Sequence, residues 1–135
     1  MDVWTLIFAI AASTAASADV SGDYQAVTET EYAIDLTLQK SGQARLIFRT
    51  WEADGSATPS TKIFTGAWSR SGTIIALKLE SGQSARFRAN ECLPYAEFGQ
   101  TGCSYGLSLV STTLPKRYGL QRFGLWRSES LRVQR

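Results

Sequence analysis

The feature that most constrains the fold of this chain is an alternation of apolar and polar residues between residues 62 and 91. A period of two is what a pleated strand with one buried face requires. Two Ser-Gly pairs, at 71–72 and 81–82, interrupt the alternation, and glycine supplies the positive φ that tight turns need. The segment is therefore predicted to form three antiparallel strands. The apolar residues on their shared face are Phe64, Trp68, Ile75, Leu77, Leu79, Ala85, Phe87 and Ala89.

The lengths of the turns predict how the strands pair. A two-residue loop at 71–72 and a three-residue loop at 81–83 both set apolar residues opposite one another. Upstream, a three-residue loop at 40–42 with Gly42 in the left-handed position does the same, whereas a two-residue loop would oppose Leu38 to Arg45. The predicted pairs are Trp68 with Ile75, Phe64 with Leu79, Leu79 with Ala85, Leu77 with Phe87, Leu38 with Ala44, Leu36 with Leu46, and Ile34 with Phe48.

Further short strands are predicted on both sides of this central segment, and no stretch after residue 18 has the apolar spacing of a helix. The fold class is therefore all-β. Eight consecutive strands in an open sheet would leave two unprotected edges, and closure into a single antiparallel up-and-down barrel of the lipocalin-like kind removes them. The additional strands are predicted at 22–27, 32–39, 43–51, 105–109 and 118–127.

The first eighteen residues differ from the rest. An apolar run over 3–12 precedes Ala16-Ser17-Ala18, which is typical of a secretory signal peptide cleaved before Asp19, although Asp2 stands where a basic residue is usual. An uncleaved anchor is disfavoured because spanning a bilayer takes about 20 apolar residues. We therefore expect a signal peptide at 1–18, a barrel at 19–127, a frayed tail at 128–135, a periplasmic or secreted location, and no stable membrane insertion after cleavage.

Cys92 and Cys103 are the two cysteines of the chain. In an exported protein, a pair flanking a short loop is predicted to form a disulfide, because oxidising compartments preserve such bonds. The loop between them carries Leu93, Tyr95 and Phe98, which we expect to plug one end of the barrel. The polar loop 52–61 is expected to form the lip of a mouth at the other end.

The sequence offers no catalytic constellation. It contains no histidine, the commonest general base and metal ligand, and its Ser-Gly pairs are better explained as turns than as nucleophiles. We therefore predict no catalytic residues, no metal and no cofactor. The net charge of +2 and the lack of a recognition motif predict no nucleic-acid partner.

A binding module is the better class, because an eight-stranded barrel has room either for its own side chains or for one small ligand. Gly66 lies between two inward positions, so it leaves space for an opposing side chain or for a ligand. Simple filling of the barrel is the alternative to a permanent cavity. The residues predicted to line the interior are Tyr24, Tyr32, Phe48, Phe64, Gly66, Trp68, Phe87 and Tyr105.

The Gly-x-Tyr opening at 22–24 and Thr65-Gly66-Ala67-Trp68, followed by the segment 72–77, carry a family likeness. Over residues 22–90 the chain resembles the N-terminal domain of NlpE-type envelope lipoproteins and related small lipocalin-like bacterial domains. The resemblance implies a barrel fold and an envelope location. This chain has neither a lipobox cysteine nor a Cys-x-x-Cys after the Gly-x-Tyr, so the family's metal or redox site is not carried over.

These observations predict an exported, non-catalytic binding module of the bacterial cell envelope that binds a small apolar ligand or an envelope protein. One alternative is a small barrel inhibitor of a hydrolase, such as a protease or lysozyme. A second alternative is an enzyme with an unrecognised site, which would require two titratable groups to meet inside the barrel. An open, lined interior favours a carrier, and a filled interior with a protruding apolar loop favours the inhibitor.

Overall fold

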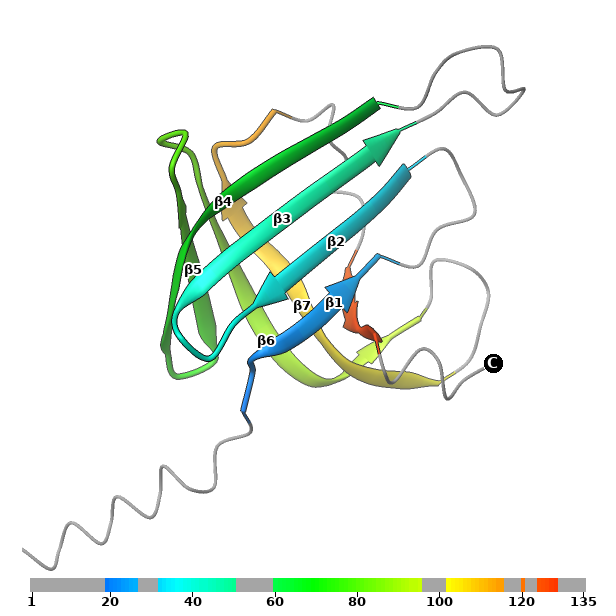
Figure 1. Ribbon diagram of the computed structural model, residues 1–135. Helices are drawn as coiled ribbons and strands as arrows, with labels where there is room; N and C mark the ends of the chain where they lie inside the picture. Colours follow the sequence, from blue (N-terminus) through cyan, green and yellow to red (C-terminus); the bar gives the residue numbers. More distant parts are fainter. Residues whose placement is uncertain are drawn as a thin grey trace, which may run out of the picture.

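The computed structural model describes residues 19–26, 32–50, 60–95, 102–115, 120 and 124–128. Within these residues the chain forms eight antiparallel strands that follow one another around a closed barrel (Figure 1). The strands are β1 (Gly22–Gln25), β2 (Tyr32–Leu38), β3 (Gln43–Thr50), β4 (Ser60–Ser71), β5 (Ile74–Leu79), β6 (Ser84–Pro94), β7 (Cys103–Thr112) and β8 (Leu125–Arg127).

The barrel closes where the first and last strands meet. Tyr24 of β1 lies opposite Arg127 of β8, and Gln25 lies opposite Trp126, in an antiparallel ladder. Every other strand pairs with its neighbours in sequence order. The predicted all-β, eight-stranded up-and-down barrel is therefore confirmed, and closure explains how so short a strand as β8 is held.

The interior of the barrel is apolar and contains a side chain from every strand. Alternate residues of each strand point inward, as the period of two requires. Phe48 and Phe64 meet edge to face, with ring centroids 5.9 Å apart. The fully buried members of this cluster with large side chains are Tyr24, Ile34, Leu36, Leu38, Leu46, Phe48, Ile75, Leu77, Phe87, Leu107, Leu120 and Leu125.

The β2–β3 turn has the predicted form. Gly42 adopts φ +100°, its N–H donates to the carbonyl of Gln39 at 2.9 Å, and Leu38 lies opposite Ala44. The residues 80–82 form the same three-residue turn, with Gly82 at φ +94° and the same bond to the carbonyl of Leu79. Glycine therefore occupies the third position in both turns, where the left-handed conformation is needed.

The predicted registers on either side of β5 are wrong by two residues. The turn that joins β5 to β6 consists of residues 80–82 rather than 81–83. Leu77 therefore lies opposite Ala85 and not opposite Phe87. The loop between β4 and β5 is Gly72-Thr73 rather than Ser71-Gly72, with glycine in the first position at φ +62°, as in a type II′ turn. Trp68 consequently lies opposite Leu77. A shift of two keeps every side chain on its predicted face.

The strands on the C-terminal side depart further from the prediction. β7 extends beyond the predicted 105–109 at both ends, and β6 continues to Pro94, past the predicted segment 62–91. The pairing of β6 with β7 is interrupted between Arg86 and Phe87 and again between Asn90 and Leu93. β8 contains three residues instead of the predicted 118–127, and Leu120 lies in a turn. β4 begins at Ser60, so Ser60 and Thr61 belong to a strand rather than to the predicted lip.

Several predicted features lie outside the described residues. These are the signal segment 1–18, the loop 52–59, Phe98 and the tail beyond Ser128. The described residues contain no helix of the length and apolar character needed to cross a membrane.

Candidate functional site

The residues predicted to line the interior occupy inward positions, and four of them are fully part of the core. Tyr24, Phe48, Phe64 and Phe87 expose between 0% and 7% of their surface. Trp68 and Tyr105 are half-buried and pack against the same cluster. The side chain of Tyr32 is outside the described residues. The described positions therefore come together as a packed apolar core.

The space next to the Cα of Gly66 is filled by the backbone of β5. A Cβ placed on Gly66 would meet the carbonyl oxygen of Lys78 and would lie 2.7 Å from the Cα of Leu79. The glycine lets β4 approach the backbone of β5 closely, which is a known role of glycine within a strand. The space that a side chain would take at this position is filled by the backbone of the neighbouring strand.

The charged side chain of Arg127 points inward at the end of the barrel where the chain enters it, which we call the N-terminal end. Its guanidinium carbon lies 4.5 Å from the ring centroid of Tyr105 and 5.4 Å from that of Tyr24. Its Nη2 donates to the carbonyl of Asp19 at 2.6 Å and to the Tyr24 hydroxyl at 3.0 Å. Cation–π contacts and hydrogen bonds thus hold the guanidinium of Arg127 at this position.

The two tyrosines beside Arg127 are held in their neutral form. Burial raises the pKa of Tyr24, and the hydrogen bond and charge of Arg127 offset only part of that effect. Burial likewise raises the pKa of Tyr105. A group that titrates above its ordinary value of 10.0 is poorly matched to proton transfer near neutral pH. The three side chains meet inside the barrel, but their arrangement suits closure of the N-terminal end better than catalysis.

The segment preceding β1 completes this closure. Val20 is buried, and its carbonyl accepts a hydrogen bond of 2.8 Å from the Tyr24 hydroxyl. Asp19 lies 3.7 Å from the ammonium of Lys40, and hydrogen bonds from Ser21 lower the pKa of its exposed carboxyl group. The first residues after the predicted cleavage point are therefore part of the folded barrel.

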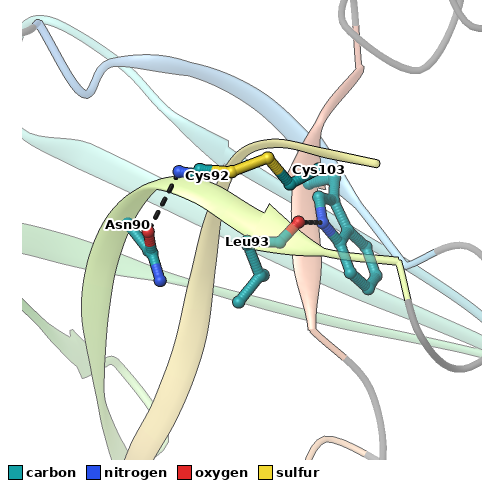
Figure 2. The surroundings of a disulfide bond; sticks show 5 residues. Asn90, Cys92, Leu93 and Cys103 are labelled. Atoms are coloured by element: carbon teal, nitrogen blue, oxygen red, sulfur yellow. Dashed lines mark hydrogen bonds between the residues drawn. A yellow bond between two sulfur atoms is a disulfide. The ribbon is translucent and has the colours of Figure 1, made fainter. Parts of the chain in front are cut away.

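A second, smaller apolar cluster lies on the outer face of the barrel, beside the disulfide (Figure 2). Leu125 of β8 points into the core, so its neighbour Trp126 points outward, yet Trp126 is also buried. Tyr95 covers it with ring centroids 5.7 Å apart, and the indole N–H donates to the carbonyl of Leu93 at 2.9 Å. The prediction that Leu93 and Tyr95 plug one end of the barrel is therefore wrong.

The disulfide between Cys92 and Cys103 is formed, as predicted, and it joins the end of β6 to the start of β7 with Cα atoms 4.9 Å apart. The backbone N–H of Cys92 donates to the side-chain oxygen of Asn90 at 2.9 Å, within the bulge of β6 (Figure 2). The bond thereby fixes the extension of β6 that carries Leu93 and Tyr95. A disulfide at this place is compatible with an oxidising compartment.

The outer surface provides polar features but no metal site among the described residues. A hollow of about 330 Å³ lies beside β3, β4 and the 80–82 turn, and polar and apolar surface line it in about equal parts. The residues that line it are Gln39, Gln43, Ala44, Arg45, Thr65, Gly66 and Glu80. No group of three potential ligands in the described part of the chain is placed to hold a metal ion. The hollow is partly open to solvent and only half apolar, whereas the pocket typical of small-ligand carriers is enclosed and mostly apolar.

Sequence reasoning missed Arg127 and Trp126. The adjacent pair Leu125-Trp126 carried a usable signal, because two consecutive large apolar residues in a strand indicate that both faces are covered. Arg127 carried no comparable signal, since a basic residue at a strand end is ordinarily exposed.

Comparison of this chain with family models, with curated proteins and with solved structures finds no match. The resemblance to NlpE-type domains therefore stays a prediction.

Proposed function

We propose that this protein is an exported, non-catalytic binding barrel of the cell envelope that recognises another protein through its surface, and that its interior is a structural core. The packed interior carries the proposal, because four of the side chains predicted to line a ligand cavity are buried in the apolar core. These are Tyr24, Phe48, Phe64 and Phe87. A carrier of apolar molecules needs an enclosed space of several hundred Å³ lined by such side chains. Because side chains of the protein itself fill the interior, we place the binding of a partner on the outer surface of the barrel.

Two further observations support this assignment. The N-terminal end is closed by Val20 and by Arg127 between Tyr24 and Tyr105, which obstructs entry from that side. The disulfide suits a protein that works outside the reducing cytoplasm. Periplasmic or secreted location is part of the proposal.

An apolar fluorescent probe tests the choice between core and carrier. N-phenyl-1-naphthylamine added to the native protein is expected to show no saturable rise in emission. The matched variant Phe87→Ala vacates one phenyl ring of the core and is expected to bind benzene, detected as a rise in its melting temperature, since apolar cavities accept apolar ligands of their own size. Circular dichroism checks that the variant folds, because such a truncation costs about 3–5 kcal/mol. Stoichiometric binding by the unaltered protein would favour the carrier.

Native mass spectrometry of the protein, purified without denaturation from the source periplasm, tests the partner. The expected result is a stoichiometric complex with a second protein. A small molecule that is retained in the native protein and released on unfolding would overturn the proposal.

A further inference from the structure

β4 has an open edge near its beginning. The strand contains twelve residues, but β5 pairs with it only from Gly66 onward, while β3 pairs with it from Ser60. Figure 1 shows β4 running on beside β3, away from the hairpin of β5 and β6. Residues 60–64 therefore have a hydrogen-bonded neighbour on one side only among the described residues.

The ladder geometry identifies which groups face this edge. The N–H of Trp68 donates to the carbonyl of Gly42 on the β3 side, and the carbonyl of Thr65 accepts from the N–H of Glu80 on the β5 side. Backbone groups alternate between the two sides along a strand. The N–H and C=O groups of Thr61 and Ile63 thus point to the open edge, where they have no backbone partner in the described part of the chain.

The side chains on this edge are those of a recognition strand. Ile63 exposes 51% of its surface and lies beside the half-buried Ile47 on the outer face. Lys62, between Thr61 and Ile63, is exposed on the opposite face, with its ammonium 5.6 Å from the ring centroid of Phe64. The edge thus combines an apolar side chain, one positive charge and the backbone groups of two residues that have no backbone partner among the described residues.

A second copy of this chain fits the edge poorly. Two copies could pair their β4 edges antiparallel about a two-fold axis, with Thr61 of each copy opposite Ile63 of the other. In that register Lys62 of one copy lies directly opposite Lys62 of the other, and the like charges repel. A register centred on Ile63 requires the position of Thr65, which Glu80 already occupies. Lysine is also a residue that protects exposed edges from self-pairing.

We propose that the open edge of β4 binds an extended segment of a partner protein by strand addition, with an acidic residue of the partner opposite Lys62 and an apolar residue beside Ile63. Main-chain bonds to Thr61 and Ile63 supply affinity, and Lys62 supplies selectivity, as in other strand-addition complexes. The inference rests on the proposed function, since it specifies how that protein partner is recognised.

The probe for this proposal is the peptide acetyl-TVEVT-amide, titrated into the isotopically labelled protein. Saturable changes are expected in the backbone amide signals of Thr61 and Ile63, with slower hydrogen exchange at both. The peptide acetyl-TVKVT-amide should bind about fivefold more weakly, because an opposed charge pair contributes up to about 1 kcal/mol. Methylation of the backbone nitrogens of both valines in acetyl-TVEVT-amide removes the peptide N–H groups that would donate to β4. This change should abolish binding.

Charge reversal makes the test specific. Lys62→Glu is expected to invert the preference between the two peptides, while Arg88→Glu, an equal charge change on the exposed face of β6, leaves the preference unchanged. Equal affinity for the methylated peptide, an unaltered preference in Lys62→Glu, no saturable change at all, or a dimer that pairs through Ile63 would each overturn the proposal. A failed titration leaves the native mass measurement of a partner unaffected, so the two proposals can fail separately.

Discussion

The β2–β3 and β6–β7 hairpins reach the same barrel by different means. β2 and β3 pair without interruption from Tyr32–Thr50 to Leu38–Ala44 and turn through three residues. β6 and β7 pair with two irregularities, are joined by a disulfide and carry apolar side chains on their outer face. One hairpin is held by its register and its turn, and the other by a covalent bond and a second small core.

This difference shows what each kind of connection requires. A three-residue turn with glycine in the third position fixes the register directly. The pairing of β6 with β7 contains a bulge at Asn90–Leu93, which moves Leu93 to the outer face, where it packs over Gly106. There the structure relies on the disulfide and on Trp126, which is covered by Tyr95.

The largest effect is expected from the regular hairpin. Leu46→Ala removes a side chain of β3 that is 0% exposed, and such truncations destabilise by about 2–5 kcal/mol. The free energy of unfolding from urea denaturation measures the loss. A cost below about 1 kcal/mol would indicate slack space in the interior and would argue against a packed core.

The next largest effect is expected from removal of the disulfide, which should loosen the β6–β7 hairpin and leave the β2–β3 hairpin unchanged. Replacing both cysteines, Cys92→Ser with Cys103→Ser, should lower the free energy of unfolding by about 2–3 kcal/mol, because the closed loop is short. Hydrogen exchange is expected to accelerate in β6 and β7 and to stay slow in β2 and β3, and the emission of Trp126 should shift to the red. Uniform acceleration in both hairpins would show that the disulfide is not a local constraint.

A paired substitution on β7 sharpens the account of the outer cluster. A Cβ on Gly106 would lie 2.8 Å from the carbonyl of Leu125 and from the side chain of Leu93, so Gly106→Ala should cost about 1–3 kcal/mol. Ser104, on the same face, has a buried hydroxyl without a hydrogen-bond partner. Ser104→Ala should therefore be neutral or slightly stabilising. Thermal unfolding compares the two, and the reverse order would refute the packing described.

The predictability of the two hairpins from sequence follows the same division. Gly42 and the alternation around it predicted the β2–β3 register correctly. The registers around β5 were wrong by two residues because a shift of two conserves the faces, so the hydrophobic pattern cannot detect it. The positions of Gly72 and Gly82 within their turns decide the register, and Gly82 repeats the arrangement of Gly42.

The candidate site was predictable in part. Alternation placed Phe48, Phe64 and Phe87 inside, but it cannot distinguish a lined cavity from a packed core, because both require the same residues. The outward turn of Leu93 depends on a bulge, and the inward turn of Arg127 depends on the closure of β8 against β1. Both are set by long-range pairing that a local pattern does not contain.

The smallest effect concerns the seam between the hairpins, where β8 meets β1. Burial raises the pKa of Tyr24, so the folded state binds its proton more tightly than the unfolded state does. The resulting stability is present below the ordinary value of 10.0 and is lost as pH rises through the folded value. Tyr24→Phe should cost about 1 kcal/mol near neutral pH through its lost hydrogen bonds.

The same variant should show a shallower loss of stability above pH 10.0, with the remaining slope due in part to Tyr105. Urea denaturation at several alkaline pH values measures both slopes. Parallel slopes for the variant and the unaltered protein would contradict a buried, neutral Tyr24.

The most direct test of the central claim is a crystal structure of the protein purified without denaturation from its source. The account predicts that Tyr24, Phe48, Phe64 and Phe87 fill the interior of a barrel closed by β1 and β8, with no density inside it other than protein. Density for a bound molecule among those side chains, displacing them from one another, would contradict the account.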